Sequence, residues 1–416
     1  MSVSTPPAWA PEVFAPWPHT PGALLARVAA RSQSFNPTGA AGGAPVLIGS
    51  AAGDTAPDVG RRARGELMER MGNVLAGRAA EAEAEAGRPR RLPDDHDRVR
   101  TGTWSELRRA GVPAADPAES AATPTVLTPD RAFTHEVRQL WCRGRETGSG
   151  EDIWVPAGAA FLHHRPPPGC TATHRAGSTG VAAHRGPDAA AAHAAWEILE
   201  RDLVRRSWYD PLRHPPAPFD ANGVLSAGAR ELRHLLGHEG LQATALALPA
   251  PAGATAVAVC VHEPDRTHQT WGARCGPAHD LPETVARACW EALMVRWSMS
   301  TPVAGRAWDR LAHTGVPRTE LDHALWAFHA QDALTRWAGP ASALRAPLAA
   351  TAARRPARDP DPVALLAAHT GREVIAVDCR AGPPADEGLA VVRLIAPGAS
   401  PLPAHPVPGV PPHPFG

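Results

Sequence analysis

Glutamates beside apolar side chains recur on three predicted helices that are far apart in the chain. The segment AAWEILERDLVRR (194–206) carries Glu197 and Glu200, and the segment RGELMERMG (64–72) repeats this spacing with Glu66 and Glu69. A third segment, ACWEALMVR (288–296), carries Glu291. Side chains three residues apart point to the same side of a helix. Each glutamate pair therefore forms one patch of negative charge next to a core-facing surface.

Two interpretations of these patches remain open. For one isolated helix, a solvated edge whose carboxylates pair with nearby arginines is the simpler one. If the helices meet, four or five carboxylates converge, which is unfavourable unless cations lie among them. Magnesium suits such a place because it takes a few carboxylates and leaves positions for water and phosphates. Phosphate oxygens in turn suit Arg70, Arg201 and Arg287. The pattern thus indicates a nucleoside triphosphate site.

Familiar phosphate-binding loops do not account for this site. The sequence contains no lysine and hence no G-x-x-x-x-G-K-[ST] loop. The stretches GAAGGAP (39–45) and GSAAGD (49–54) are rich in glycine, and plain turns are the first interpretation of both. The second stretch, which includes Ser50, could also hold phosphate at the entrance of the following helix.

Composition argues against several classes of protein. The 42 basic and 42 acidic residues balance without a basic stripe, which argues against nucleic-acid binding. The six cysteines are scattered without metal-site spacing and are interpreted as reduced, mostly buried thiols. We find no secretory signal and no run of the ~18 apolar residues that a membrane helix needs. A cytoplasmic protein without a membrane segment is expected.

The order of strands and helices predicts an α+β fold with mixed sheets and packed helices. We expect a variable lead-in over 1–45, in which only 22–31 looks helical, a main domain over 46–398 and a proline-rich tail over 399–416. The expected strands are 46–51, 241–249, 255–263, 373–380 and 389–397, with a strand-like segment over 151–164. The expected helices are 58–78, 188–206, 226–238 and 282–297, with several alanine-rich helices after them.

These segments, in this order, resemble the YcaO family. The resemblance covers roughly residues 46–416. It rests on Glu66-Glu69-Arg70, a hairpin over 140–158 that ends in Val-Pro-Ala, the turn STGVAAH (178–184), the helix segment EILERD (197–202), Arg287 with Glu291 and Arg296, and VVRLIAPG (391–398).

The resemblance implies ATP and Mg2+ bound between the acidic helices, and phosphorylation of a peptide-bond oxygen. In the family's cyclodehydratases, a Cys, Ser or Thr of a ribosomal precursor peptide closes on the preceding carbonyl and becomes an azoline. Thioamide or amidine formation by the same activation is an alternative, as is a degenerate member that only binds a peptide or a partner enzyme. By position, Glu66, Glu69, Glu197 and Glu200 would ligate magnesium. Nucleotide or phosphate contacts would come from Ser50, Ser178, Arg201, Arg287 and Glu291, in part by holding the ligands in place.

The carboxyl terminus and three substitutions bear on activity. Family cyclodehydratases tend to end in a proline-rich tail that reaches the active site, and Pro412 and Pro414 are the matching prolines here. Thr179, His184 and Met294 depart from residues common in the family and put catalytic competence in question. No leader-peptide-binding module is expected before residue 46, so a partner protein that presents the precursor peptide is expected. The sequence leaves open whether the chain forms a homodimer.

Overall fold

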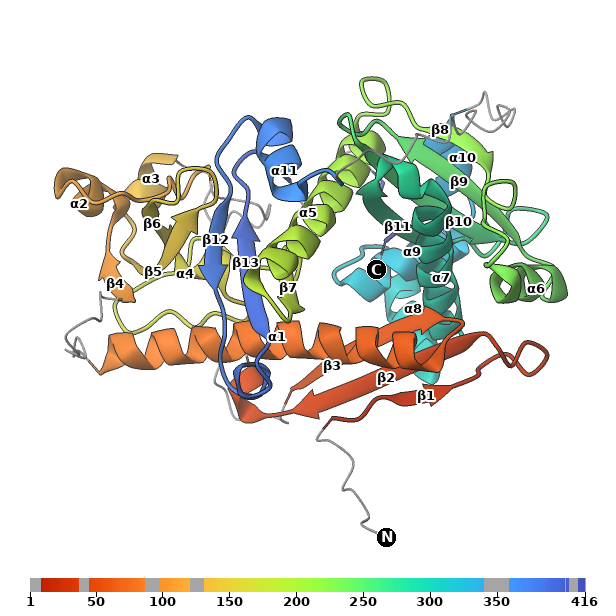
Figure 1. The fold of residues 1–416 in the computed structure, drawn as a ribbon, viewed down its shortest axis with the longest axis horizontal. Coiled ribbons are helices and arrows are strands. Elements are labelled where there is room, and N and C mark those ends of the chain that lie inside the picture. The colour runs from red at the N-terminus through yellow and green to blue at the C-terminus, as the bar shows by residue number, and fades with distance from the viewer. Residues whose placement is uncertain are drawn as a thin grey trace, which may run out of the picture.

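The computed structural model describes residues 9–36, 45–86, 98–119, 131–339, 359–400, 402–403 and 411–415. Its first layer is an antiparallel sheet in the order β1-β2-β3, formed by β1 (Glu12–Phe14), β2 (Leu24–Arg31) and β3 (Val46–Gly53). The helix α1 (Ala56–Glu85) packs on β3 and β2 and runs along the length of the molecule (Figure 1). It confirms the predicted helix 58–78.

The predicted helix over 22–31 is wrong, because these residues form β2. The strand pairs with β3 from Leu24↔Gly53 to Arg31↔Val46, and buried and exposed residues alternate along its second half. Leu, Ala and Arg favour helices in isolation, but pairing with a neighbouring strand overrides so weak a preference. The boundary that we expected at residue 46 therefore falls inside one sheet.

The second layer is a six-stranded sheet in the order β4-β5-β12-β13-β7, with β6 paired to β5 alone. The β5–β6 pair confirms the predicted hairpin over 140–158, and β12 and β13 confirm the two closing strands. The short helices α2 (Trp104–Arg109), α3 (Arg131–Glu136) and α4 (Ala157–Ala160) lie in the same part of the chain. The strands are β4 (Val99–Gly102), β5 (Gln139–Glu146), β6 (Asp152–Pro156), β7 (Val181–His184), β12 (Ile375–Asp378) and β13 (Ala390–Ile395).

The third layer is an antiparallel sheet in the order β11-β10-β9-β8. Its strands are β8 (Ala217–Asp220), β9 (Gln242–Leu248), β10 (Ala254–His262) and β11 (Thr270–Pro277), with helices α6 (Arg230–His238) and α7 (Leu281–Met299) packed against it. Sequence analysis predicted β9, β10, α6 and α7 but missed β11. Two glycines, an arginine and a proline interrupt the apolar pattern of TWGARCGP, which hides this strand in the sequence.

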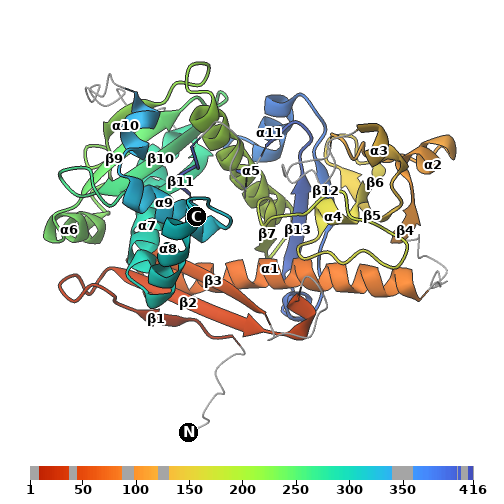
Figure 2. The ribbon, with the colours of Figure 1, turned by 180° about the vertical axis from the view of Figure 1, so that it is seen from behind.

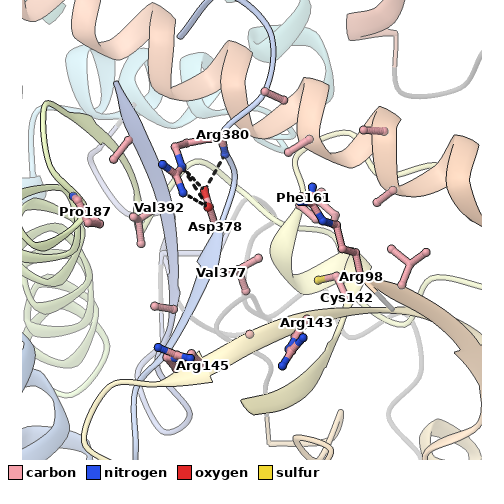
Figure 3. A pocket seen from close by; sticks show the side chains of 18 of the residues that line it. Arg98, Cys142, Arg143, Arg145, Phe161, Pro187, Val377, Asp378, Arg380 and Val392 are labelled. Atoms are coloured by element: carbon pink, nitrogen blue, oxygen red, sulfur yellow. Dashed lines mark hydrogen bonds and ion pairs between the residues drawn. The ribbon is translucent and has the colours of Figure 1, made fainter. Parts of the chain in front are cut away.

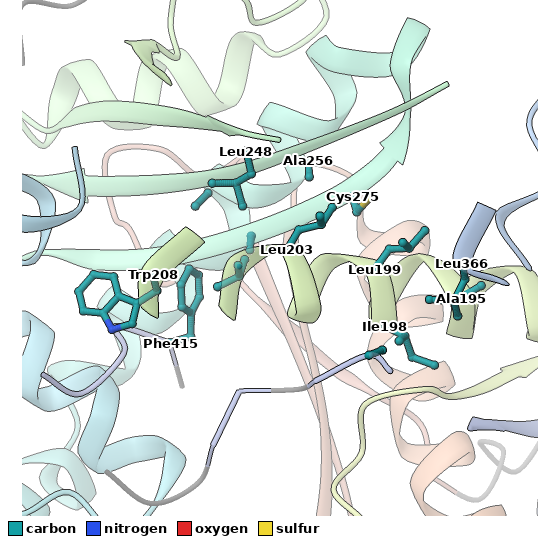
Figure 4. Packing of buried hydrophobic residues seen from close by; sticks show 14 of the residues in the cluster. Ala195, Ile198, Leu199, Leu203, Trp208, Leu248, Ala256, Cys275, Leu366 and Phe415 are labelled. Atoms are coloured by element: carbon teal, nitrogen blue, oxygen red, sulfur yellow. The ribbon is translucent and has the colours of Figure 1, made fainter. Parts of the chain in front are cut away.

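Helix α5 (Pro187–Tyr209) lies between the second and third layers and contacts β7, β13 and β11 (Figures 1 and 2). Its apolar side chains, among them Ile198, Leu199 and Leu203, belong to the same core as Leu248 and Ala256 (Figure 4). The remaining elements are η1 (Gln33–Phe35), η2 (Ala278–Asp280), α8 (Pro302–Thr314), α9 (Glu320–Ala330), α10 (Ala333–Ala338), α11 (Pro362–Thr370) and α12 (Pro383–Asp386).

The three glutamate-bearing helices begin in the same way. Each has a proline in its first turn followed by an acidic residue, which suits the free N–H groups and the positive end of the helix dipole. The pairs are Pro57-Asp58 in α1, Pro187-Asp188 in α5 and Pro282-Glu283 in α7.

Two glycines let β3 and β11 lie directly on the helices that follow them. A Cβ atom at Gly49 would come 2.0 Å from the carbonyl oxygen of Ala63 in α1. At Gly272 it would come 2.2 Å from the carbonyl oxygen of Ala288 in α7. Any larger residue would therefore push the strand away from its helix.

We expect Gly272→Ala to destabilise the fold by about 1–3 kcal/mol, because the clash is with helix backbone that cannot move aside. Gly305→Ala in α8 is the matched control, since a Cβ atom there meets nothing within 4 Å. That variant should be neutral or stabilised by up to ~1 kcal/mol. Urea denaturation of both variants measures the difference, and equal stabilities would refute the close-packing argument.

Candidate functional site

One cavity of about 780 Å3 lies between α1, α5, α7, β3 and β11. The structure thus brings together helices whose glutamates are more than 200 residues apart in sequence, as the converging-helix interpretation requires. Ser178, Pro412 and Pro414 were also predicted for the site, but they are not among the residues that line this cavity. The predicted residues that do line it are Ser50, Glu66, Glu69, Glu197, Glu200, Arg201, Arg287 and Glu291.

A backbone N–H group fixes one glutamate on each helix. The N–H of Ser50, one residue after Gly49, donates to Glu66 Oε2 at 2.7 Å. The N–H of Ala273, one residue after Gly272, donates to Glu291 Oε2 at 3.2 Å. On α5, the N–H of Gly180 donates to Glu197 Oε2 at 3.0 Å. The close strand-to-helix packing therefore orients the carboxylates as well as stabilising the fold.

Gly180 needs its conformation for this contact. Its φ of 83° lies in the left-handed region that glycine tolerates, and a Cβ atom there would come 2.8 Å from Ile198 Cδ1. The predicted turn at 178–184 thus presents a backbone N–H to α5. Ser178 takes part in this turn through its carbonyl oxygen, which accepts from the Val181 N–H at 3.0 Å.

The second glutamate of each pair is in an unfavourable charge environment. Burial, followed by repulsion from Glu197 and Glu66, raises the pKa of Glu69 well above its usual value. Glu200 is 3% exposed. Burial raises its pKa to about 7, against the opposing effect of Arg274 and Arg201 and with added repulsion from Glu291. Carboxyl groups held in this way would gain from an added cation.

Three arginines offset part of the negative charge. Arg70 Nη2 lies 2.6 Å from Glu66 Oε1. Arg201 lies between two glutamates, with its Nε 3.5 Å from Glu200 Oε1 and its Nη2 3.9 Å from Glu291 Oε1. Burial opposes the charge of Arg201, but Glu200 and Glu291 raise its pKa above the usual value.

The third arginine, Arg274, was missed by sequence analysis. It extends from β11 with its Nη1 3.5 Å from Glu200 Oε2, and it lines the cavity. The sequence signal that could have found it is the repeated order of strand, glycine and acidic helix, which places Gly272 and Glu291 in correspondence with Gly49 and Glu66. Arg287, which was predicted, lies at the rim, where its Nε is 2.6 Å from Glu283 Oε1 and its Nη1 is 3.5 Å from Asp58 Oδ2.

The donor set fits magnesium bound together with a phosphate ligand. Among the described residues, no three Asp, Glu, His or Cys side chains are close enough to enclose a metal ion by themselves. Magnesium is commonly held by one or two carboxylates and completes its shell with water and substrate phosphates. The mutually repelling carboxyl groups of Glu69, Glu197 and Glu200 supply such ligands on one wall of the cavity.

Two of the three departures from the family pattern lie in the cavity wall. His184 and Met294 line the cavity, whereas Thr179 is not among its lining residues. Met294 follows Glu291 by three residues, just as Glu69 follows Glu66. Helix α7 therefore presents one carboxylate and one thioether where α1 presents two carboxylates.

The carboxyl-terminal residues 411–415 pack against α5, α9 and β11. The Trp208 indole donates to the carbonyl oxygen of Pro411 at 3.3 Å. Phe415 is 2% exposed, with its ring centroid 6.2 Å from that of Trp271 and 6.0 Å from that of Trp337. The His413 ring stacks on His323 at 3.9 Å. The segment is thus part of the core beside β11, which carries Arg274 (Figure 4).

Acid is expected to weaken the packing of this segment. His413 is 4% exposed, and burial, together with His323, Arg201 and Arg205, lowers its pKa to about 3, against a weaker opposite effect of the Pro403 carbonyl. The unfolded chain has a histidine pKa of about 6.5 and binds the proton first as pH falls. Stability is therefore lost below about pH 6.5, by up to ~1.4 kcal/mol per pH unit.

The measurement is the unfolding free energy of the wild type and of His413→Gln at pH 7 and pH 5. We expect the variant to lose less stability than the wild type over this interval. The comparison cancels groups with the opposite trend, such as Glu200, whose raised pKa favours the folded state at lower pH. A difference between the two proteins that does not change with pH would contradict the assignment.

A second cavity, of about 590 Å3, lies between α1, β5 and β12 (Figure 3). Its charged lining includes Arg143, which pairs with Asp152, and Arg380, whose Nη2 is 2.7 Å from Asp378 Oδ2. None of the paired glutamates lines it. The acidic site is therefore the larger cavity.

Comparison with known families decides the relationship. The sequence profile of the family described as YcaO cyclodehydratase, ATP- and Mg2+-binding, matches residues 52–400. The chain belongs to the YcaO family. The predicted cofactors, ATP and Mg2+, are those of the family and are confirmed at this level.

Solved YcaO structures share the fold, and they confirm the predicted α+β class. A heterocyclase in complex with substrate and cofactor has a TM-score of 0.64 at 19% identity and covers 94% of this chain and 50% of its own. YcaO from Methanopyrus kandleri, bound with AMPPCP and Mg2+, has a TM-score of 0.57 at 19% identity over 94% and 85% of the two chains. The E. coli microcin synthetase McbBCD complex has a TM-score of 0.60 at 12% identity over 95% and 90%.

One curated relative matches a shorter region. An uncharacterised protein of Methanothermobacter thermautotrophicus is 29% identical over 102 residues, which are 24% of this chain and 26% of the relative. This YcaO chain thus aligns with about a quarter of that relative and spans half the length of the heterocyclase. Among the described residues, no helix combines the length and apolarity needed to cross a bilayer.

Proposed function

We propose that this YcaO protein is an ATP-dependent cyclodehydratase that converts Cys, Ser or Thr residues of a ribosomal precursor peptide to azolines. The observation that carries the proposal is the convergence of Glu66, Glu69, Glu197, Glu200 and Glu291 on one cavity that also holds arginines. Such a site suits phosphoryl transfer, in which catalysis depends mainly on positioning and on charge stabilisation.

The chemistry distributes over the cavity as follows. Glu69, Glu197 and Glu200 hold magnesium, which neutralises the triphosphate charge when it is bound. The thiol or hydroxyl of the peptide attacks the preceding carbonyl carbon, and the resulting oxyanion takes the γ-phosphoryl group of ATP, releasing ADP. Loss of phosphate, with loss of the amide proton, leaves a C=N bond, so the peptide loses one water. Arg201 and Arg274 lie where developing phosphate charge needs stabilisation.

Two kinds of partner belong to this proposal. The precursor peptide is the substrate, and a separate leader-binding protein presents it. The described complexes of related proteins support both, since one of them is the McbBCD complex with pro-MccB17 bound. Pro412 and Pro414 act from the tail that packs beside β11, and Ser178 acts through the turn that holds Glu197. Whether the protein is a homodimer is a question for mass measurements in solution.

Mass spectrometry tests the proposal. The protein, ATP, Mg2+, the partner protein and the precursor peptide are incubated, and the loss of one water per modified residue is expected. Glu197→Gln is the matched control, and it should leave the peptide unchanged. Replacement of oxygen by sulfur would indicate thioamide formation instead, and incorporation of an amine with loss of water would indicate an amidine.

A second candidate is a non-catalytic YcaO protein that binds a precursor peptide or a partner enzyme. It is favoured by His184 and Met294, because both of these departures lie in the cavity wall. Met294 removes a polar group from the place that corresponds to Glu69 in α1. An unchanged peptide mass without phosphate release, together with measurable binding of the peptide, would support this candidate over the enzyme.

A further inference from the structure

The inference concerns Arg274 and rests on the proposed nucleotide site. Arg274 is on β11, an edge strand of its sheet, and its backbone is fixed opposite Val257 of β10. Its side chain passes into the acidic cavity, where 36% of it remains exposed. The only carboxylate within ion-pair distance of it in the described chain is Glu200, which is 3% exposed. Only the side chain of Arg274 is therefore free to move.

The contact between Arg274 and Glu200 is loose. The Nη1 to Oε2 distance is 3.5 Å, which is longer than the 2.7–2.9 Å typical of a charge-assisted hydrogen bond. Other arginines of the cavity wall are held tightly: Arg70 lies 2.6 Å from Glu66 and Arg287 lies 2.6 Å from Glu283. Arg274 thus compensates the charge of Glu200 without being locked to it.

Arg274 and a metal ion compete for the same carboxylate. Two cations that share Glu200 at short distance would repel each other, and the divalent ion gains more from the carboxylate than a loosely held guanidinium does. A released guanidinium would lie in the cavity beside the phosphates that enter with the metal. Its planar fork of donors matches phosphate oxygens.

The geometry points to Arg274 as an exchangeable counter-ion. In the nucleotide-free protein it neutralises Glu200 and opposes the binding of Mg2+ alone. When Glu200 ligates magnesium that arrives with ATP, Arg274 turns to the phosphate oxygens. The cavity therefore binds the metal–nucleotide complex in preference to the free metal.

Calorimetric titrations of Arg274→Gln test both halves of this exchange. With Mg2+ alone, the variant should bind the ion roughly 10-fold more tightly than the wild type, because the competing cation is gone. With AMPPCP and Mg2+, it should bind the nucleotide roughly 10-fold more weakly, because a phosphate contact is lost. A merely structural role would not move the two affinities in opposite directions.

Two further variants sharpen the result. Arg274→Lys keeps the positive charge but not the fork, so it should bind free Mg2+ as weakly as the wild type and still lose part of its AMPPCP affinity. Arg64→Gln is the control, since Arg64 also lines the cavity but pairs with Glu387. Both affinities of that variant should equal those of the wild type.

The outcomes separate the two proposals. If the wild type binds no AMPPCP, the nucleotide site is wrong, and the exchange falls with it. If the wild type binds AMPPCP but Arg274→Gln does not tighten the binding of free Mg2+, only the role of Arg274 is overturned. That role is also overturned if Arg274→Gln retains full AMPPCP affinity.

Discussion

Glu200→Gln is expected to lower the rate of ATP hydrolysis by at least ~100-fold while changing the unfolding free energy by less than ~1 kcal/mol. The rate falls because glutamine keeps the shape of the side chain but loses the charge that a metal ion needs. Stability is retained because burial already raises the pKa of Glu200 to about 7, so that its carboxyl group takes up a proton readily near neutral pH. The neutral side chain also relieves repulsion from Glu291 and Glu197.

Phosphate release and thermal unfolding measure the two effects in the same preparation. Glu283→Gln is the matched control, because Glu283 is an α7 glutamate at the cavity rim with a 61% exposed side chain. It should keep both activity and stability within experimental scatter. Normal ATP turnover by Glu200→Gln would show that the acidic helices do not form the nucleotide site.

Phe415→Ala is expected to destabilise the protein by about 3–5 kcal/mol, the cost of removing a buried aromatic side chain from a core. Phe415 is 2% exposed and lies between Trp271 and Trp337. Because Trp271 is on β11, three residues before Arg274, the loss should also weaken nucleotide binding. A residue at the end of a proline-rich tail would otherwise be expected to tolerate truncation.

Urea denaturation and AMPPCP titration check this prediction. Phe415→Leu keeps most of the apolar volume and should lose less stability than the alanine variant. Leu212→Ala removes a side chain that is 94% exposed and should change neither property. A loss below ~1 kcal/mol for Phe415→Ala would mean that the tail does not belong to the core.

The acidic helices were the most predictable part of the protein. The spacing of Glu66 with Glu69, and of Glu197 with Glu200, follows from helix geometry alone, and the structure places all four in one cavity. The sequence also indicated β9, β10, β12 and β13, whose apolar runs are long enough to stand out. These features depend on periodicity, which is local and can be seen in a single segment.

Features that depend on contacts between distant segments were missed or misassigned. Residues 24–31 have the composition of a helix and form a strand because β3 pairs with them. TWGARCGP carries too few consecutive apolar residues to be recognised, yet it forms the edge strand that supplies Arg274. Arg287 was predicted to serve the phosphates and instead pairs with Glu283 and Asp58 at the rim in this structure.

The sequence by itself determined which residue types face the same side of each helix, because that depends only on the helical repeat. It also indicated that a cation is needed if those faces meet. Only the tertiary structure decided that they do meet, that Gly49 and Gly272 let two strands approach close enough to orient the carboxylates, and that Arg274 enters the cavity. Charge compensation and close packing are properties of atoms brought together from distant segments, so no single stretch of the chain contains them.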